Sequence, residues 1–237
     1  MRALILAAGR GERMRPLTDA TAKPLLTAGG RRLIEWQLEA LARAGIRDIV
    51  INTAHLPQQF EDALGDGARH GVRLAWSREG ERAEDALETL GGIVRALPRL
   101  GSAAFIVVSG DIVTDYDYRA LHEPARAIDA GAAEAHLVLV DNPPFHPHGD
   151  MGLVDGLVAP DREPRLTYAN IGVFAPRLFA GLPAERARLF PWLYTAARAG
   201  RVTGEHATAR WFNVGTPAEL ERVDAELRMR EPGVGRP

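Results

Sequence analysis

The sequence predicts an α/β protein with a mostly parallel β-sheet that is covered by helices on both faces. Short apolar runs alternate with amphipathic stretches along the first half of the chain, which is typical of strands and helices in turn. The run Phe105–Val108 is apolar without alternation, as expected for a central strand that is buried on both faces. With 237 residues and 46% hydrophobic content, the chain can bury the core of one large domain.

The elements of the first half follow from hydrophobic periodicity. In the first expected helix, Ile34, Leu38 and Leu41 share one face. Gly45 follows that helix directly and is expected to end it. The expected strands are Ala3–Ala8, Asp48–Thr53, Val72–Ser77, Ala104–Ser109 and His136–Val140. The expected helices are Arg31–Ala44, Pro57–Leu64 and Ala83–Leu97.

The pattern changes after about Asp141, where Asp141–Asp150 is rich in proline and histidine and indicates a loop. Thr216 followed by Pro217 is a favourable start for a final helix. The tail, Arg230–Pro237, is expected to fray. The other segments expected to be ordered are Gly152–Val158, Tyr168–Phe174, a helix near Leu189–Ala199 and a strand in Ala209–Gly215.

Composition excludes several classes of protein. The chain has no cysteine, so a disulfide framework, a thiolate nucleophile and a cysteine-based metal site are impossible. The formal net charge of −2 does not suggest a nucleic-acid-binding surface. No apolar run approaches the ~18 residues that a membrane span needs. The N-terminal apolar run is short and is followed at once by charged residues, unlike a signal peptide. We expect a soluble, cytoplasmic protein that binds neither nucleic acid nor membranes.

The loop that follows the first strand carries glycines and an excess of positive charge. Gly9 and Gly11 allow a ligand to approach the backbone closely, at the carboxyl end of a strand where open α/β sheets bind ligands. The dinucleotide fingerprint is excluded because its third glycine position holds Met14, and the P-loop sequence is absent. The residues suit a polyphosphate, and a solvated surface loop is the alternative. The cationic donors are Arg13, Arg15 and Lys23.

Two further segments carry oxygen ligands next to glycines. Asp111 follows an apolar strand and Gly110, and such a carboxylate can hold Mg²⁺ and leave room for phosphate oxygens. The alternative is that Asp111 only caps the turn that follows. Asn213 lies at a strand end before Gly215 and offers a neutral oxygen, although a plain strand-to-helix turn is the simpler interpretation of this segment alone.

Together these segments resemble the sugar-1-phosphate nucleotidyltransferase family. Leu4–Leu26 is similar to the signature of that family, a glycine-rich loop with arginine, then Pro-Leu-Thr and Lys-Pro. Ser109–Asp111 and Asn213–Leu220 are similar to its two metal-bearing segments. The resemblance implies the nucleotide-diphospho-sugar transferase fold: Rossmann-like, three-layered, with a mixed, mostly parallel sheet and a small sugar-binding lobe.

The resemblance also implies how the single domain, 1–237, is organised and what it does. About 1–140 would bind the nucleotide, about 141–215 the sugar, and 216–230 would form a C-terminal helix. The segments that indicate uridylyl transfer to N-acetylmuramate 1-phosphate, in cell-wall sugar recycling, are Val50–Gln59, Leu87–Ile93, Gly110–Tyr118, His136–Pro143 and Gly204–His206. The implied substrates are UTP and a sugar 1-phosphate, the implied cofactor is Mg²⁺, and the implied state is a monomer or small homo-oligomer. The alternatives are guanylyl or thymidylyl transfer, another sugar, and an inactive nucleotide-sugar sensor.

In the implied reaction, an oxygen of the sugar 1-phosphate attacks the α-phosphorus of the triphosphate and pyrophosphate leaves. The implied catalytic residues are Arg13 at the departing pyrophosphate, Lys23 between the α-phosphate and the incoming phosphate, and Asp111. The implied nucleotide-binding residues are Ala8, Gly9, Arg10, Gly11, Glu12, Arg13, Lys23, Ser109 and Gly110. The implied sugar-phosphate ligands are Glu88, Thr89, Asp141, Asn142, Asp150 and Asn170. Asp111 and Asn213 would hold the metal.

Three residues depart from the pattern of the family. Asn213 stands where aspartate is usual, which removes a charge from the implied metal site. Ala22 stands where proline is usual before Lys23, and it is expected to loosen the loop. Leu90 stands where a third glycine is usual, and it is expected to crowd the sugar or base pocket.

Overall fold

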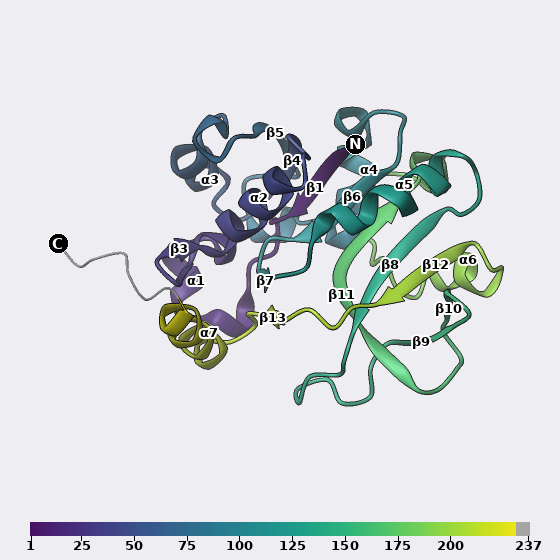
Figure 1. The fold of residues 1–237 in the computed structure, drawn as a ribbon. Helices are drawn as coiled ribbons and strands as arrows, with labels where there is room; N and C mark the ends of the chain where they lie inside the picture. Colours follow the sequence, from purple (N-terminus) through teal and green to yellow (C-terminus); the bar gives the residue numbers. More distant parts are fainter. Residues whose placement is uncertain (231–237) are drawn as a thin grey trace.

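A computed structural model describes residues 1–230 and shows three layers, with a mixed sheet between two layers of helices (Figure 1). The main sheet has nine strands in the order β5-β4-β1-β6-β11-β8-β12-β10-β9. The first four strands in this order run parallel, whereas β11 pairs antiparallel with both β6 and β8. The strands are β1 (Arg2–Leu6), β4 (Asp48–Thr53), β5 (Arg73–Arg78), β6 (Phe105–Ser109), β8 (Ala135–Val140), β9 (Met151–Val154), β10 (Leu157–Ala159), β11 (Arg165–Phe174) and β12 (Val202–His206).

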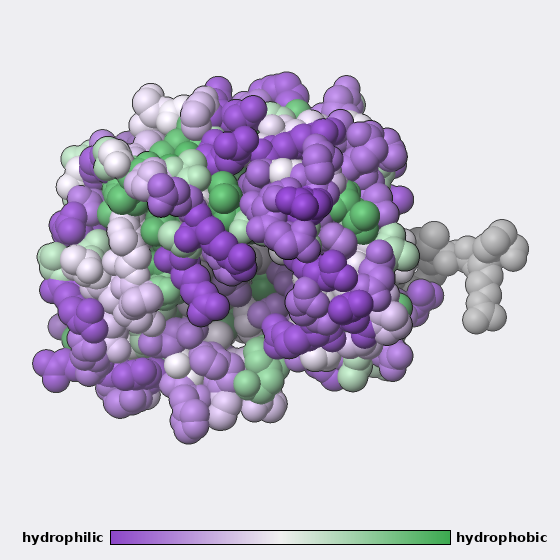
Figure 2. Space-filling view, turned by 180° about the vertical axis from the view of Figure 1, so that it is seen from behind, coloured by the Kyte–Doolittle hydropathy of each residue, from purple (hydrophilic) through white to green (hydrophobic). Residues whose placement is uncertain are grey.

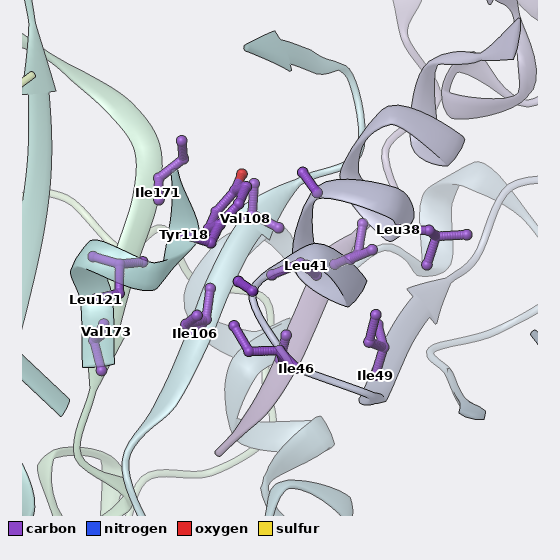
Figure 3. Close-up of a cluster of buried hydrophobic side chains, with 14 of the residues drawn as sticks. Leu38, Leu41, Ile46, Ile49, Ile106, Val108, Tyr118, Leu121, Ile171 and Val173 are labelled. Carbon is purple, nitrogen blue, oxygen red and sulfur yellow. The ribbon is translucent and has the colours of Figure 1, made fainter. Parts of the chain in front are cut away.

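One face of the sheet is covered by α2 (Leu33–Arg43), α3 (Pro57–Leu64) and α5 (His122–Asp129). Figure 3 shows Leu38 and Leu41 of α2 beside the apolar side chains of the central strands. Ile34, Leu38 and Leu41 are all 0% exposed, which confirms the predicted apolar face. Gly45 has a φ of 79°, and the N–H of Ile46 returns to the carbonyl of Leu41, so the helix ends at the predicted glycine.

The other face is covered by α4 (Glu88–Leu100) and α6 (Tyr194–Arg198). Phe105, Phe174 and Phe179 pack together beneath these helices, with ring centroids 5.9–6.4 Å apart. The predicted central strand at Phe105–Val108 is confirmed, because these residues are at most 1% exposed and pair with strands on both sides. The sequence therefore specified a sheet that is buried on both faces.

A third, smaller cluster lies beside the loop that follows β1. The helix α7 (Pro217–Arg230) packs there on the hairpin β2–β3 (Thr27–Ala28 and Arg31–Arg32) and on β7–β13 (Ile112–Thr114 and Trp211–Asn213). Met14 of the loop and Val223 of α7 are both 0% exposed in this cluster. Thr216 accepts a hydrogen bond from the N–H of Glu219 at 3.3 Å, which confirms the predicted start of α7.

Several predicted elements differ from the structure. The predicted helix Ala83–Leu97 is a 3₁₀ turn, η4 (Ala83–Asp85), followed by α4, because Ala86 is extended and Glu88, the first residue of α4, has a left-handed φ of 61°. The predicted helix near Leu189–Ala199 is shortened to α6, and Pro191 has no N–H to donate within that stretch. The short helix α1 spans Leu17–Ala20, and the other 3₁₀ turns are η1 (Glu12–Met14), η2 (Lys23–Leu25), η3 (Ala68–His70), η5 (Tyr118–Leu121) and η6 (Pro176–Phe179).

The two expected halves of the domain share one sheet. Strand β11, which belongs to the second half, pairs with β6 of the first half along Ile171–Phe174. The division near residues 140 and 215 therefore stays an interpretation of function. Nearly all of the tail expected to fray lies outside the described residues. Among residues 1–230, no helix combines the length and the apolar character that crossing a membrane requires.

Candidate active site

A cleft of about 540 Å³ opens at the carboxyl ends of β1, β4 and β6. The face of the molecule seen from behind is hollowed near its centre and is rimmed mainly by hydrophilic residues (Figure 2). Most residues predicted to bind the nucleotide line this first cleft: Ala8, Gly9, Arg10, Gly11, Glu12, Lys23 and Ser109, together with Asp111. The parallel strands bring these residues together, because their carboxyl ends meet at the same edge of the sheet.

The two glycines of the loop serve different purposes. A side chain added at Gly9 would meet nothing within 4 Å, so the backbone faces open space at the cleft. Gly11 has a φ of +70°, and an added Cβ would lie 3.0 Å from Cδ of Lys23. The carbonyl of Gly11 accepts hydrogen bonds from Thr18 Oγ1 at 3.0 Å and from the N–H of Met14 at 2.8 Å. Gly9 leaves room for a ligand, whereas Gly11 lets the loop close on Lys23.

Much of the positive charge on the loop is paired within the protein. Arg10 contacts Glu12 and Asp19 at 3.0 Å each, and Arg15 contacts Asp19 at 2.8 Å. Arg13 makes no ion pair within residues 1–230, and it lines a second cleft instead of the first. Its expected role at the departing pyrophosphate therefore stays a prediction.

Lys23 and Asp111 form an ion pair inside the first cleft. Lys23 is only 9% exposed, so its ammonium group is held where little water can screen it. Gly110 lies behind this pair, lines neither cleft, and donates its N–H to the carbonyl of Leu6 at 2.9 Å. An added Cβ at Gly110 would come within 3.2 Å of β1, so the glycine allows the approach that places Asp111.

A buried chain of hydrogen bonds through Asn52 and Glu79, which we call the relay, supports the first cleft and was not apparent from the sequence. The N–H of Ala7 donates to Asn52 Oδ1 at 2.7 Å, and Asn52 Nδ2 donates to Glu79 Oε1 at 2.6 Å. The other oxygen of Glu79 accepts the N–H of Leu87 at 2.7 Å, just before α4. Burial raises the pKa of Glu79, although its two donors oppose that shift. The only feature of the sequence that pointed to this role was the position of Asn52 near the end of a predicted strand.

The second cleft, of about 470 Å³, adjoins the first because Glu88 and Thr89 line both. Asp150 and Asn170, predicted to bind the sugar phosphate, also line it. Glu88 and Asn170 have φ values of 61° and 55°, a left-handed conformation that typically costs about 1–2 kcal/mol for residues other than glycine, although asparagine tolerates it better than glutamate. Such strain is often found at functional sites. Further lining residues are Arg13, Phe145, His146, Thr167, Tyr168, Arg188, Leu189, Phe190, Trp211 and Asn213.

Asn170 reaches the second cleft through an irregularity in β11. The register of β11 against β8 shifts between Tyr168 and Gly172, and Asn170 lies within that shift. Asp150 is held nearby, because its carboxylate accepts the N–H of Tyr168 at 2.8 Å and contacts His146 Nε2 at 3.0 Å. The bulge and the preceding loop therefore present their polar groups to the same space.

Two residues predicted to bind the sugar phosphate line neither cleft. Asp141 contacts His206 at 2.9 Å, and Asn142 donates to the carbonyl of Arg165 at 2.9 Å and accepts from Thr167 Oγ1 at 2.8 Å. These bonds fasten the 141–150 loop to neighbouring strands. The side chains at the start of this loop are thus engaged by structural partners, and a role of the loop in binding sugar phosphate stays a prediction.

The structure corrects the effects expected of two residues that depart from the family pattern, Leu90 and Ala22. Leu90 is 7% exposed and belongs to the core beneath α4, so it does not crowd either cleft. Helical geometry explains this, because Leu90, Ile93 and Val94 share the apolar face of α4. Ala22 does not leave the loop loose, since its N–H donates to Gln59 Oε1 at 3.0 Å, a bond that proline cannot make.

The two residues expected to hold a metal lie at one end of the antiparallel β7–β13 pair: Asp111 directly precedes β7, and Asn213 is the last residue of β13. Asn213 is opposite Ile112 in the β7–β13 pair, and the N–H of Val214 donates to the carbonyl of Asp111 at 3.2 Å. Within residues 1–230 there is no group of three or more His, Cys, Asp or Glu side chains that could hold a metal ion. A carboxylate and an amide oxygen nevertheless fit Mg²⁺, which keeps several waters and usually takes one or two protein ligands with substrate phosphates.

Comparison with known proteins identifies the family of this chain, and so the class of enzyme to which its two adjoining clefts belong. The nucleotidyl transferase family model matches residues 2–228, so the chain belongs to that family and is a nucleotidyltransferase. It is 47% identical over 229 residues to the N-acetylmuramate alpha-1-phosphate uridylyltransferase of Neisseria meningitidis serogroup B, covering 95% of this chain and 97% of that protein. It is 32% identical to the enzyme of the same name from Caulobacter vibrioides, covering 97% of each chain.

More distant relatives transfer other nucleotides. The mannose-1-phosphate guanylyltransferase of Mycobacterium tuberculosis is 28% identical, and the match covers 95% of this chain and 64% of that protein. Among solved structures, a Bacillus anthracis protein described as a glucose-1-phosphate thymidylyltransferase has a TM-score of 0.82 at 22% identity, covering 100% of this chain and 98% of that one. This likeness confirms the predicted nucleotide-diphospho-sugar transferase fold.

Proposed function

We propose that the protein transfers a uridylyl group from UTP to N-acetylmuramate 1-phosphate, which yields the UDP-sugar and pyrophosphate. The observation that carries this proposal is the pair of adjoining clefts that share Glu88 and Thr89. They provide room for a triphosphate and a sugar phosphate side by side. The choice of uridine and muramate rests on the similarity to the Neisseria and Caulobacter enzymes.

The chemistry in this proposal is alignment and charge stabilisation, without a covalent enzyme intermediate. The open backbone at Gly9 accommodates the triphosphate, and Lys23 exchanges its contact with Asp111 for phosphate oxygens at the α-phosphorus. Arg13 lines the second cleft and has no internal counter-ion among the described residues, so its charge is available to phosphate. The incoming phosphate oxygen then forms the new bond as pyrophosphate departs.

Asp111 and Asn213 would hold Mg²⁺ together with phosphate oxygens and water. The ion, when bound, supplies positive charge that neutralises the reacting phosphates. A test that is independent of turnover is thermal unfolding in the presence of a non-hydrolysable UTP analogue. Added Mg²⁺ should raise the unfolding temperature of the wild type but not that of Asp111→Ala.

The decisive experiment offers the protein UTP, Mg²⁺ and a panel of sugar 1-phosphates and measures pyrophosphate release. The highest kcat/KM is expected with N-acetylmuramate 1-phosphate. Absence of turnover with every sugar would favour an inactive nucleotide-sugar sensor. A clear preference for GTP or dTTP over UTP would overturn the choice of nucleotide. A role in cytoplasmic recycling of cell-wall sugars is part of the proposal and depends on the muramate substrate.

A further inference from the structure

The charged side chains of the second cleft are unevenly paired. Its acids have partners: Glu88 contacts Arg186 at 3.3 Å, and Asp150 binds His146 and the N–H of Tyr168. Arg13 and Arg188 also line this cleft, and neither makes an ion pair within residues 1–230. The cleft therefore presents two uncompensated cations, which favours a ligand with more than one anionic group.

The backbone that carries Arg188 is held rigidly, although its side chain is exposed. The N–H of Ala187 donates to the carbonyl of Leu87 at 3.0 Å, and the carbonyl of Ala187 accepts the N–H of Leu90 at 3.0 Å. On the other side, Leu189 is 3% exposed and belongs to the core. Arg188 thus projects from a backbone that is hydrogen-bonded on one side and packed on the other, so that binding a ligand has to order only its side chain.

The two arginines of this cleft that make no ion pair within residues 1–230 come from different segments of the chain. Arg13 comes from the loop after β1, and its Nη2 lies 3.2 Å from where a Cβ would stand on Gly215. Arg188 comes from the segment fixed to α4; its neighbour Arg186 lines the first cleft, whereas Arg188 lines only the second. The proposed function already assigns the charge of Arg13 to the reacting phosphates, so Arg188 remains for a second anionic group.

We propose that Arg188 determines sugar specificity by binding the carboxylate of the muramate substrate. This inference rests on the proposed function. Muramate differs from the corresponding glucosamine in its ether-linked lactate, which supplies a single carboxylate on the sugar ring. A guanidinium can bind a carboxylate through two parallel hydrogen bonds, and a sugar with a neutral hydroxyl offers no such partner.

The test compares kcat/KM for N-acetylmuramate 1-phosphate and N-acetylglucosamine 1-phosphate, each with UTP. Arg188→Ala should lower the value for the muramate substrate about 10-fold or more, the scale of a hydrogen bond to a charged group. The value for the glucosamine substrate should change less than about 3-fold, within what surface substitutions usually cause. Arg188→Glu should lower the muramate value further, and Arg188→Lys should restore part of it.

Arg198→Ala is the matched control, because Arg198 is paired with Asp161 at 2.7 Å and lines neither cleft. It should leave both kcat/KM values unchanged. Equal losses with both sugars in Arg188→Ala would overturn the inference while leaving the proposed function intact. If the wild type used only sugars without a carboxylate, the proposed function itself would fail, and this inference with it.

Discussion

The two clefts of the site are built in different ways. The first draws mainly on one continuous loop, Gly9–Lys23, and on the ends of parallel strands. The second gathers residues from separate segments, including Arg13, Asp150, Asn170 and Asn213. It also contains strained backbone at Asn170, within an irregular strand. The first cleft is thus formed largely by residues that are close along the chain or at strand ends, whereas the second depends on how distant segments fold together.

The largest expected effect comes from Lys23, the buried cation of the continuous loop. Lys23→Ala should lower kcat at least ~10²-fold, the scale of losing one preorganised charge-stabilising donor. Arg15→Ala is the control, because Arg15 pairs with Asp19 and lines neither cleft. Pyrophosphate release at saturating substrates measures the effect, and thermal unfolding checks that each variant is folded. Similar losses in both variants would contradict a specific role for Lys23.

A second prediction concerns the relay that supports the first cleft from behind. Asn52 is 2% exposed, and Asn52→Ala leaves the N–H of Ala7 without its acceptor and Glu79 with only one of its two donors, the N–H of Leu87. We expect a loss of about 1–3 kcal/mol in the free energy of unfolding, the usual cost of an unsatisfied buried group. Urea unfolding measures it, with Gln58→Ala as the control because Gln58 makes only an exposed bond to Asp62. The KM for UTP should rise more than the KM for the sugar phosphate.

Substitutions at Asn170 separate strain from ligand binding in the assembled cleft. Glycine accepts a φ of 55° without steric cost, so Asn170→Gly should unfold at a free energy no lower than the wild type. Asn170→Ala should be less stable than Asn170→Gly by about 1–2 kcal/mol. Both variants should raise the KM for the sugar phosphate, since both lose the amide, and neither should alter the KM for UTP. An unchanged sugar KM would mean that Asn170 only shapes the strand.

The smallest effect is expected at Asn213, the last residue of β13. Asn213→Asp adds a charge where the resemblance places a metal ligand, so the Mg²⁺ concentration at half-maximal activity should fall several-fold. Asn213→Ala should raise it. Calorimetric titration of Mg²⁺ into the complex with a UTP analogue should give the same ranking of Mg²⁺ affinity, with Asn213→Asp highest, the wild type next and Asn213→Ala lowest. A midpoint that stays the same in both variants would show that this residue is not a metal ligand.

Much of the first cleft could be predicted from the sequence because its chemistry is local. The glycines, Lys23 and Asp111 each follow a strand that is recognisable from its apolar run. The relay through Asn52 and Glu79 could not be predicted, since an ordinary asparagine and glutamate meet only when β4 and β5 are paired. The missed elements α5 and β12 span only eight and five residues, and Pro124 within α5 argues against a helix there, so neither stood out along the chain.

The prediction of Leu90 as a residue that crowds the site failed for a related reason. Similarity shows which positions lie near a site but not which way a helix turns them, and α4 turns Leu90 to the core and Thr89 to the clefts. Asp141 and Asn142 show the same limit in a loop.

The sequence by itself determined the alternation of strands and helices, the glycine-bearing loop after β1 and the family, because these depend on local propensity and on residues close along the chain. Only the tertiary structure decided which side chains share a cleft. It set Arg13 and Arg188 in the same cleft without counter-ions among the described residues, and it paired Asp150 and Glu88. Electrostatic pairing acts through space, so the charge that a site leaves for its ligand is known only once the chain is folded.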